Sequence, residues 1–94
     1  MAKLLHDVTF KRMKPGEYQS ARRHPKHSKS MYKIVKYSES HGKGWHVYCL
    51  GDDGEYVVWK PEKLAEYLNE YYNWDSQCFQ SLTIAKRAVN THLM

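Results

Sequence analysis

Three segments in the middle of the chain are predicted strands, and in the second of them Trp45, Val47 and Cys49 alternate with His46, Tyr48 and Leu50 on the opposite face. The three segments are MYKIVKYS at 31–38, GWHVYCL at 44–50 and EYVVWK at 55–60. β-Branched and aromatic residues are frequent in all three, as strands favour. The Gly-Asp-Asp-Gly run at 51–54 favours a tight turn, because Asp and Gly tolerate left-handed dihedrals. The pattern therefore predicts a three-stranded antiparallel meander.

Two later segments show the helical period instead. The first follows Pro61, a residue type favoured at the start of a helix, and its apolar positions are Leu64, Tyr67, Leu68 and Tyr71. Residues 73–76 break this pattern. The second runs from Ser81, a favoured N-cap, to about Leu93, and its inward positions are Leu82, Ala85, Ala88 and Val89. The predicted fold class is α+β: a small antiparallel sheet of three to four strands followed by two C-terminal helices packed on one face.

The first 30 residues hold few large apolar side chains. The segment 14–30 contains two prolines and only one such residue, so it cannot bury enough surface to offset the entropy of ordering. We expect residues 1–30 to form a basic, partly flexible N-terminal arm, with a short strand over 5–12, and residues 31–94 to form a compact α+β domain.

Composition and charge sharpen this division. Leu, Ile, Val and Phe together make up only 17 of 94 residues, so the eight Tyr and three Trp must supply part of the core. Residues 1–37 carry ten Lys and Arg against two acids, a net charge of +8, whereas 38–94 carry five against eight, a net charge of −3. The positive half is the strongest functional signal in the sequence.

A cluster of cations of this kind can neutralise phosphates and release their counterions, which makes nucleic acid the first candidate partner. The candidate phosphate contacts are Lys11, Arg12, Lys14, Arg22, Arg23, Lys26, Lys29, Lys33 and Lys36. Rings on an uncovered sheet face can stack unpaired bases, and Tyr48 and Tyr56 are the candidates that would share one face. The alternatives are a solvated tail and an arm that contacts an acidic protein surface.

A second candidate surface lies on the first predicted helix. Glu62, Glu66 and Glu70 recur every four residues and would form one acidic stripe with Trp74 near its end. Such a stripe is either an ordinary solvated helix face or a site for a protein partner, and the partner could be the basic arm of a second copy in a homodimer.

The sequence offers little for catalysis or metal binding. His24 and His27 are the one close pair of metal-ligand type, and neighbouring cations repel a metal ion. His46 and Cys49 would point to opposite faces of their strand, which disfavours a nucleophilic pair. Asp52 and Asp53 are explained by a turn. We therefore expect no metal, no cofactor and no enzymatic activity.

No apolar run is long enough to span a membrane, and the N-terminal segment does not have the pattern of a signal peptide. Together with two unpaired cysteines, this favours a cytoplasmic location with both thiols reduced. The sequence thus predicts a small non-enzymatic protein that binds nucleic acid, DNA or RNA, through its basic arm and an aromatic-rich sheet. The alternative is a protein-binding modulator or inhibitor, such as a phage or mobile-element accessory protein acting on a nucleic-acid-processing machine.

Overall fold

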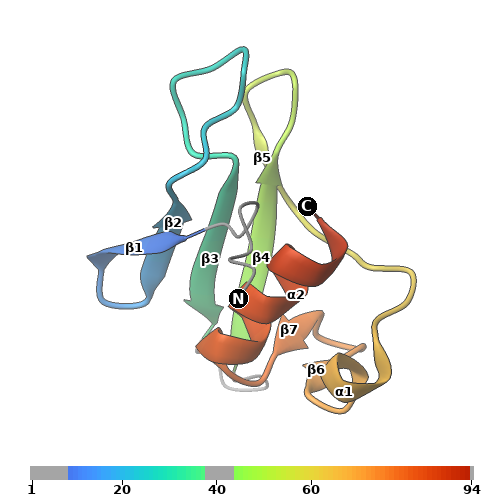
Figure 1. Cartoon of the computed structure of the whole chain (residues 1–94). Coiled ribbons are helices and arrows are strands. Elements are labelled where there is room, and N and C mark those ends of the chain that lie inside the picture. The colour runs from blue at the N-terminus through green and yellow to red at the C-terminus, as the bar shows by residue number, and fades with distance from the viewer. Residues whose placement is uncertain (1–8, 38–43, 94) are drawn as a thin grey trace, which may run out of the picture.

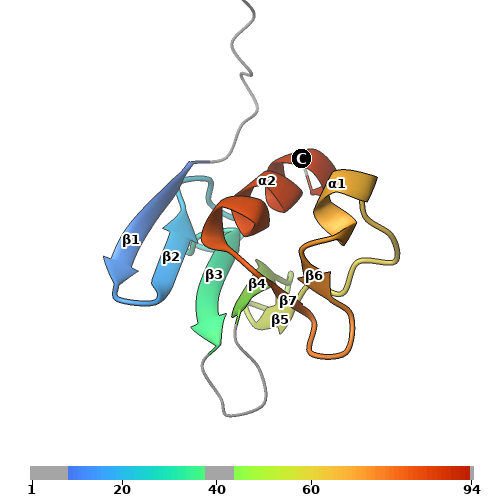
Figure 2. The ribbon, with the colours of Figure 1, turned by 90° about the horizontal axis from the view of Figure 1, so that it is seen from below.

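The computed structural model describes residues 9–37 and 44–93. They form an antiparallel sheet of seven strands with both helices on the same side (Figures 1 and 2). The strands are β1 (Phe10–Lys14), β2 (Glu17–Ser20), β3 (Tyr32–Tyr37), β4 (Gly44–Leu50), β5 (Tyr56–Val58), β6 (Tyr72–Asn73) and β7 (Cys78–Phe79). The helices are α1 (Glu66–Asn69) and α2 (Leu82–His92).

The strand order is β1-β2-β3-β4-β7-β6, and β5 also pairs with β4. Strand β4 therefore has two neighbours on one side: its second half pairs with β5, and Trp45 near its start pairs with Phe79 of β7. Gly44 is needed where β4 meets β7, because a Cβ there would lie 2.7 Å from the carbonyl oxygen of Phe79. The centre of the sheet is thus the β3–β4 pair: β2, β5 and β7 pair with it directly, and β1 and β6 pair with β2 and β7.

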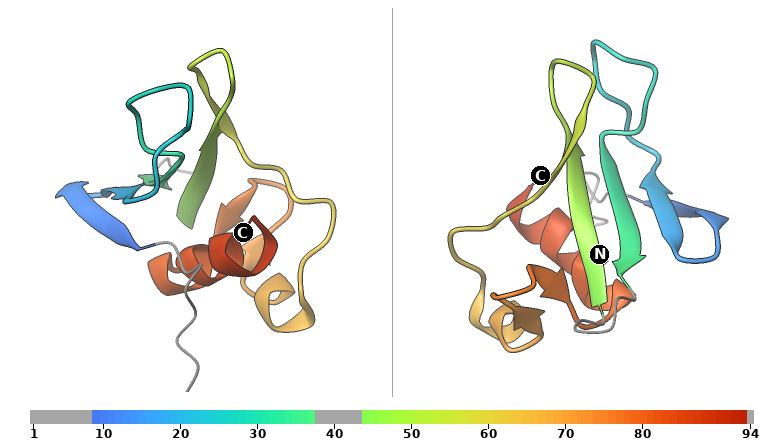
Figure 3. Two further views of the ribbon diagram at one scale, coloured as in Figure 1. Left: turned by 45° about the horizontal axis from the view of Figure 1, so that its top comes forward. Right: turned by 180° about the vertical axis from the view of Figure 1, so that it is seen from behind.

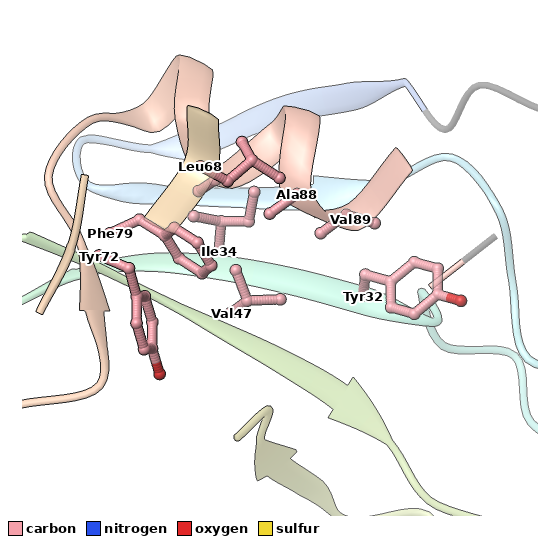
Figure 4. Close-up of a cluster of buried hydrophobic side chains, with 9 residues drawn as sticks. Tyr32, Ile34, Val47, Leu68, Tyr72, Phe79, Ala88 and Val89 are labelled. Atoms are coloured by element: carbon pink, nitrogen blue, oxygen red, sulfur yellow. The ribbon is translucent and has the colours of Figure 1, made fainter. Parts of the chain in front are cut away.

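One face of the sheet is covered by α2 and forms the core. Ile34, Val47 and Phe79 point from three strands toward α2, which presents Ala85, Ala88 and Val89 (Figure 4). The small alanines let the helix backbone approach the sheet closely. Ser81 caps α2 through its side-chain oxygen, which accepts a hydrogen bond from the backbone N–H of Ile84 at 3.1 Å.

Local sequence patterns predicted several of these elements correctly. The strands expected at 31–38, 44–50 and 55–60 are β3, β4 and β5, and the capped helix expected from Ser81 is α2. The predicted break at 73–76 is the turn between β6 and β7, where the side-chain oxygen of Asn73 accepts backbone hydrogen bonds from Asp75 and Ser76.

The predicted fold class is wrong in both its strand count and its helices. The sheet has seven strands instead of three or four, and one helix of several turns instead of two. The helix expected from Pro61 is reduced to one turn at α1, because Ala65 provides no side-chain cap and the next residues join the sheet. Tyr72 pairs with Phe79, so the chain leaves the helical path at this point.

Part of the segment predicted as the N-terminal arm belongs to the sheet. Strands β1 and β2 form a hairpin that pairs with β3. Hydrogen bonds between the strands therefore order residues that bury too little apolar surface to be ordered by packing. Gly16 adopts a positive φ of 83° at the turn, and the Tyr18 ring packs against the core. Of the strand predicted over 5–12, residues 10–12 belong to β1, and residues 5–8 lie outside the described part of the chain.

Candidate nucleic-acid interface

Within the described residues, the second face of the sheet carries no helix (Figure 3, right). Side chains alternate along each strand, so the neighbours of buried Ile34 point away from α2. The pairing registers align five residues into one line across this face, and we call it the cross-strand row. It consists of Lys11, Gln19, Lys33, Tyr48 and Val58, one each from β1 to β5.

The middle of the row is a cluster of one cation and two rings. The ammonium group of Lys33 lies 4.2 Å from the ring centroid of Tyr56 and 5.5 Å from that of Tyr48. The Tyr56 hydroxyl donates to the carbonyl of Ser30 at 2.7 Å, so this side chain extends from β5 across β4. Leu50, its register partner on β4, is consequently buried. Tyr48 and Tyr56 therefore share one face, as the alternation predicted.

The cations expected to contact phosphate do not form one flat patch. Lys11 and Lys33 belong to the open face, whereas Arg12 and Lys36 pair with residues of the helix-covered face. Lys14 lies beside the β1–β2 turn. The remaining four are exposed in the loop between β2 and β3, and they are Arg22, Arg23, Lys26 and Lys29. The positive charge therefore surrounds the β1 edge of the sheet and continues into this loop.

The β2–β3 loop is held against the β4–β5 turn (Figure 1). His24 is buried, its Nδ1 accepts the backbone N–H of Lys26 at 3.0 Å, and its Nε2 donates to the Asp52 carboxylate at 3.1 Å. His27 contacts the Asp52 carbonyl at 2.8 Å, and the Lys29 ammonium donates to the Gly54 carbonyl at 3.2 Å. These contacts give the loop a defined position.

Few of these cations are neutralised within the protein. Residues 9–37 contain nine Lys and Arg and one acid, Glu17. Among the described residues, only Lys14 and Lys26 have a carboxylate within ion-pair distance, each at 3.8 Å. Both pairs are largely exposed on the lysine side and contribute little to stability. The other seven cations have no carboxylate partner in this part of the chain, so their charge is not neutralised there.

The acidic stripe predicted on the first helix is not formed as expected. Of its three glutamates only Glu66 lies within α1, Glu70 is the C-cap residue, and Glu62 lies in the irregular segment before the helix. Trp74 is 45% exposed and is fixed by its indole N–H, which donates to Asn69 Oδ1 at 2.7 Å. Glu66, Glu70 and Trp74 are all exposed.

One Cys–His contact was missed by the sequence reasoning. Cys78 Sγ lies 3.2 Å from His46 Nε2, whereas the sequence drew attention to Cys49. Burial raises the pKa of Cys78 and lowers the pKa of His46, so both groups remain neutral near pH 7. A protonated, fully buried thiol is a poor nucleophile. No local pattern reveals this contact, because it depends on the pairing of β4 with β7.

Within residues 9–37 and 44–93, no three His, Cys, Asp or Glu side chains are placed to hold a metal ion. The same part of the chain has no helix long and apolar enough to cross a membrane. Comparisons with protein-family models, curated proteins and solved structures found no match for the chain.

Proposed function

We propose that this protein is a non-enzymatic nucleic-acid-binding protein that contacts the phosphate backbone through the basic side of its sheet. The observation that carries the proposal is the set of seven cations in residues 9–37 that have no carboxylate partner among the described residues. Phosphate is the anion that such a spread of cations recognises without sequence readout.

The structure of residues 9–37, which we call the basic region, supports this proposal. Residues that were expected to be a loose arm are held in the β1–β2 hairpin and in the fixed β2–β3 loop. A positioned cation loses less conformational entropy on binding than one on a flexible chain. The opposite end of the molecule, around α1 and β6, carries Glu66, Glu70 and Asp75 and would be repelled by phosphate.

The test is fluorescence anisotropy with labelled oligonucleotides at about 50 and 200 mM salt. The variant replaces Lys11, Arg12 and Lys14 of β1 with Gln. Its matched control replaces Lys60, Lys63 and Arg87, which are exposed cations outside the basic region. The β1 variant should lower the slope of log affinity against log salt by about 1.4 to 1.8, which is the contribution of Lys11 and Arg12 at about 0.7 to 0.9 for each phosphate contact, because Lys14 already lies 3.8 Å from the Glu17 carboxylate.

Two results would refute the proposal. One is the absence of binding at the lower salt concentration. The other is an equal loss of affinity in the β1 variant and in its control, because general charge and not the basic region would then govern binding.

A second candidate function is binding of a protein with a basic surface. It is favoured by three exposed rings within eight residues, Tyr67, Tyr71 and Trp74, next to Glu66 and Glu70. A second copy of this chain offers such a basic surface. Sedimentation velocity at low salt should then show a dimer that Trp74→Ala abolishes, whereas a monomer at all concentrations excludes this self-association.

The compartment is also part of the proposal. Cys49 and Cys78 are both free thiols. Thiols persist in a reducing environment, so the free thiols support our proposal of a cytoplasmic location.

A further inference from the structure

We infer that the open face of the sheet binds an unpaired nucleic-acid strand, which lies across the strands along the cross-strand row with one base stacked on Tyr48. The inference rests on the proposed function and specifies its ligand. Its basis is the order of chemical groups in the row: cation, amide, cation, ring, from Lys11 through Gln19 and Lys33 to Tyr48.

This order matches the chemistry of a single strand. Neighbouring strands of a sheet are about 4.8 Å apart, so Lys11 and Tyr48 are separated by about 14 Å along the row. A single strand presents charged phosphates and flat bases side by side over such a distance. Two lysines can contact phosphates while the ring next to them takes a base, and stacking tolerates any base because each has a π face.

The two tyrosines have different roles in this arrangement. Tyr56 is anchored by its hydroxyl to Ser30, covers Leu50, and has the Lys33 ammonium above its ring. It positions Lys33. Tyr48 is half-buried, its hydroxyl has no hydrogen bond within the described part of the chain, and its ring is 5.5 Å from Lys33 and 6.2 Å from the His46 ring. Tyr48 is therefore the ring that stacks.

A duplex uses this face less well. The flat surfaces of its bases are hidden in the stack, so Tyr48 would gain no partner and only the lysines would contact phosphate. The competing arrangement is insertion of the two-stranded β1–β2 ribbon into the major groove, which has room for such a ribbon. That arrangement does not involve Tyr48, so the two can be distinguished by one residue.

The test compares binding of a labelled single strand of about 12 nucleotides with binding of a duplex of the same sequence, at about 50 mM salt. The variant Tyr48→Leu removes the ring, and Tyr48→Phe is its matched control, which keeps the ring. We expect the single strand to bind more tightly than the duplex. Tyr48→Leu should bind the single strand about tenfold or more weakly, with little change for the duplex, and Tyr48→Phe should remain within about twofold of the wild type.

A second measurement uses the unmodified protein and so does not depend on how a variant folds. A single strand carrying 5-iodouracil is irradiated in the complex, and the cross-linked peptide is identified by mass spectrometry. A cross-link at Tyr48 supports the inference, and cross-links confined to β1 and the β2–β3 loop contradict it.

The outcomes separate this inference from the proposed function. Equal or tighter binding of the duplex, with Tyr48→Leu equal to Tyr48→Phe, overturns the inference and leaves phosphate binding standing. Absence of binding to either oligonucleotide overturns both.

Discussion

Replacing Leu68 with alanine tests how the single turn of α1 is attached to the core. Leu68 is fully buried between α2 and the ring of Phe79 (Figure 4), and it is the one buried side chain of α1. Leu-to-Ala changes at such positions cost about 3 to 5 kcal/mol, and a one-turn helix at the edge of the sheet can partly collapse into the cavity. We therefore expect a loss of about 3 kcal/mol, which lowers Tm by roughly 12 to 24 °C at this chain length.

The matched control is Tyr71→Ala. In the long amphipathic helix that the sequence pattern predicts, Leu68 and Tyr71 would both face inward and cost similar amounts. In the structure Tyr71 is 44% exposed, so its removal should cost less than about 1 kcal/mol. Urea denaturation of both variants measures the difference. Equal destabilisation would show that Leu68 and Tyr71 both face the core, as in the longer predicted helix, and would refute the single turn of α1.

Two further predictions concern the loop and the thiols. His24→Ala should remove the acceptor of the Lys26 N–H and destabilise the protein by about 1 to 3 kcal/mol, with faster amide exchange at Lys26. His27→Ala should leave that amide protected, and unchanged exchange in His24→Ala would contradict the assigned contact. Burial raises the pKa of Cys49 to about 11 and the pKa of Tyr72 to about 12, so the folded state holds these protons more tightly than the unfolded chain. These two groups should therefore leave the free energy of unfolding unchanged between about pH 7 and 8 and lower it as the pH rises through 9 towards 11. Urea denaturation midpoints across this pH range measure the decline in the free energy of unfolding. Cys49→Ala should make the decline less steep. An equally steep decline in that variant would show that Cys49 contributes nothing.

The contrast between the two helices shows where sequence reasoning succeeds. Ser81 caps α2 through a hydrogen bond within one turn, and the inward positions Ala85, Ala88 and Val89 follow from helical spacing alone. The segment after Pro61 has an equally regular pattern, yet only Glu66–Asn69 is helical. Its sequence could not reveal that Tyr72 pairs with Phe79, because that pairing depends on where β7 meets β4.

The candidate site divides in the same way. Composition shows the charge asymmetry and the candidate cations. The alternation along a strand predicts the shared face of Tyr48 and Tyr56. The place of Gln19 between Lys11 and Lys33, the position of Lys33 over the Tyr56 ring and the contact of His24 with Asp52 follow from neither. Each of these joins segments that are far apart in sequence and depends on the register between strands.

By itself the sequence determined the strands β3, β4 and β5, the capped helix α2 and the positive charge of the first 37 residues, because these depend on local periods, caps and composition. The tertiary structure alone decided that β1 and β2 join the sheet, that α1 is one turn long and that four strands, β1 to β4, align Lys11 with Tyr48. The physical reason is that a backbone hydrogen bond between strands has no side-chain signature. The backbone groups of these residues can bond to water in an arm or to each other in a hairpin, and pairing with a neighbouring strand decides which of the two forms.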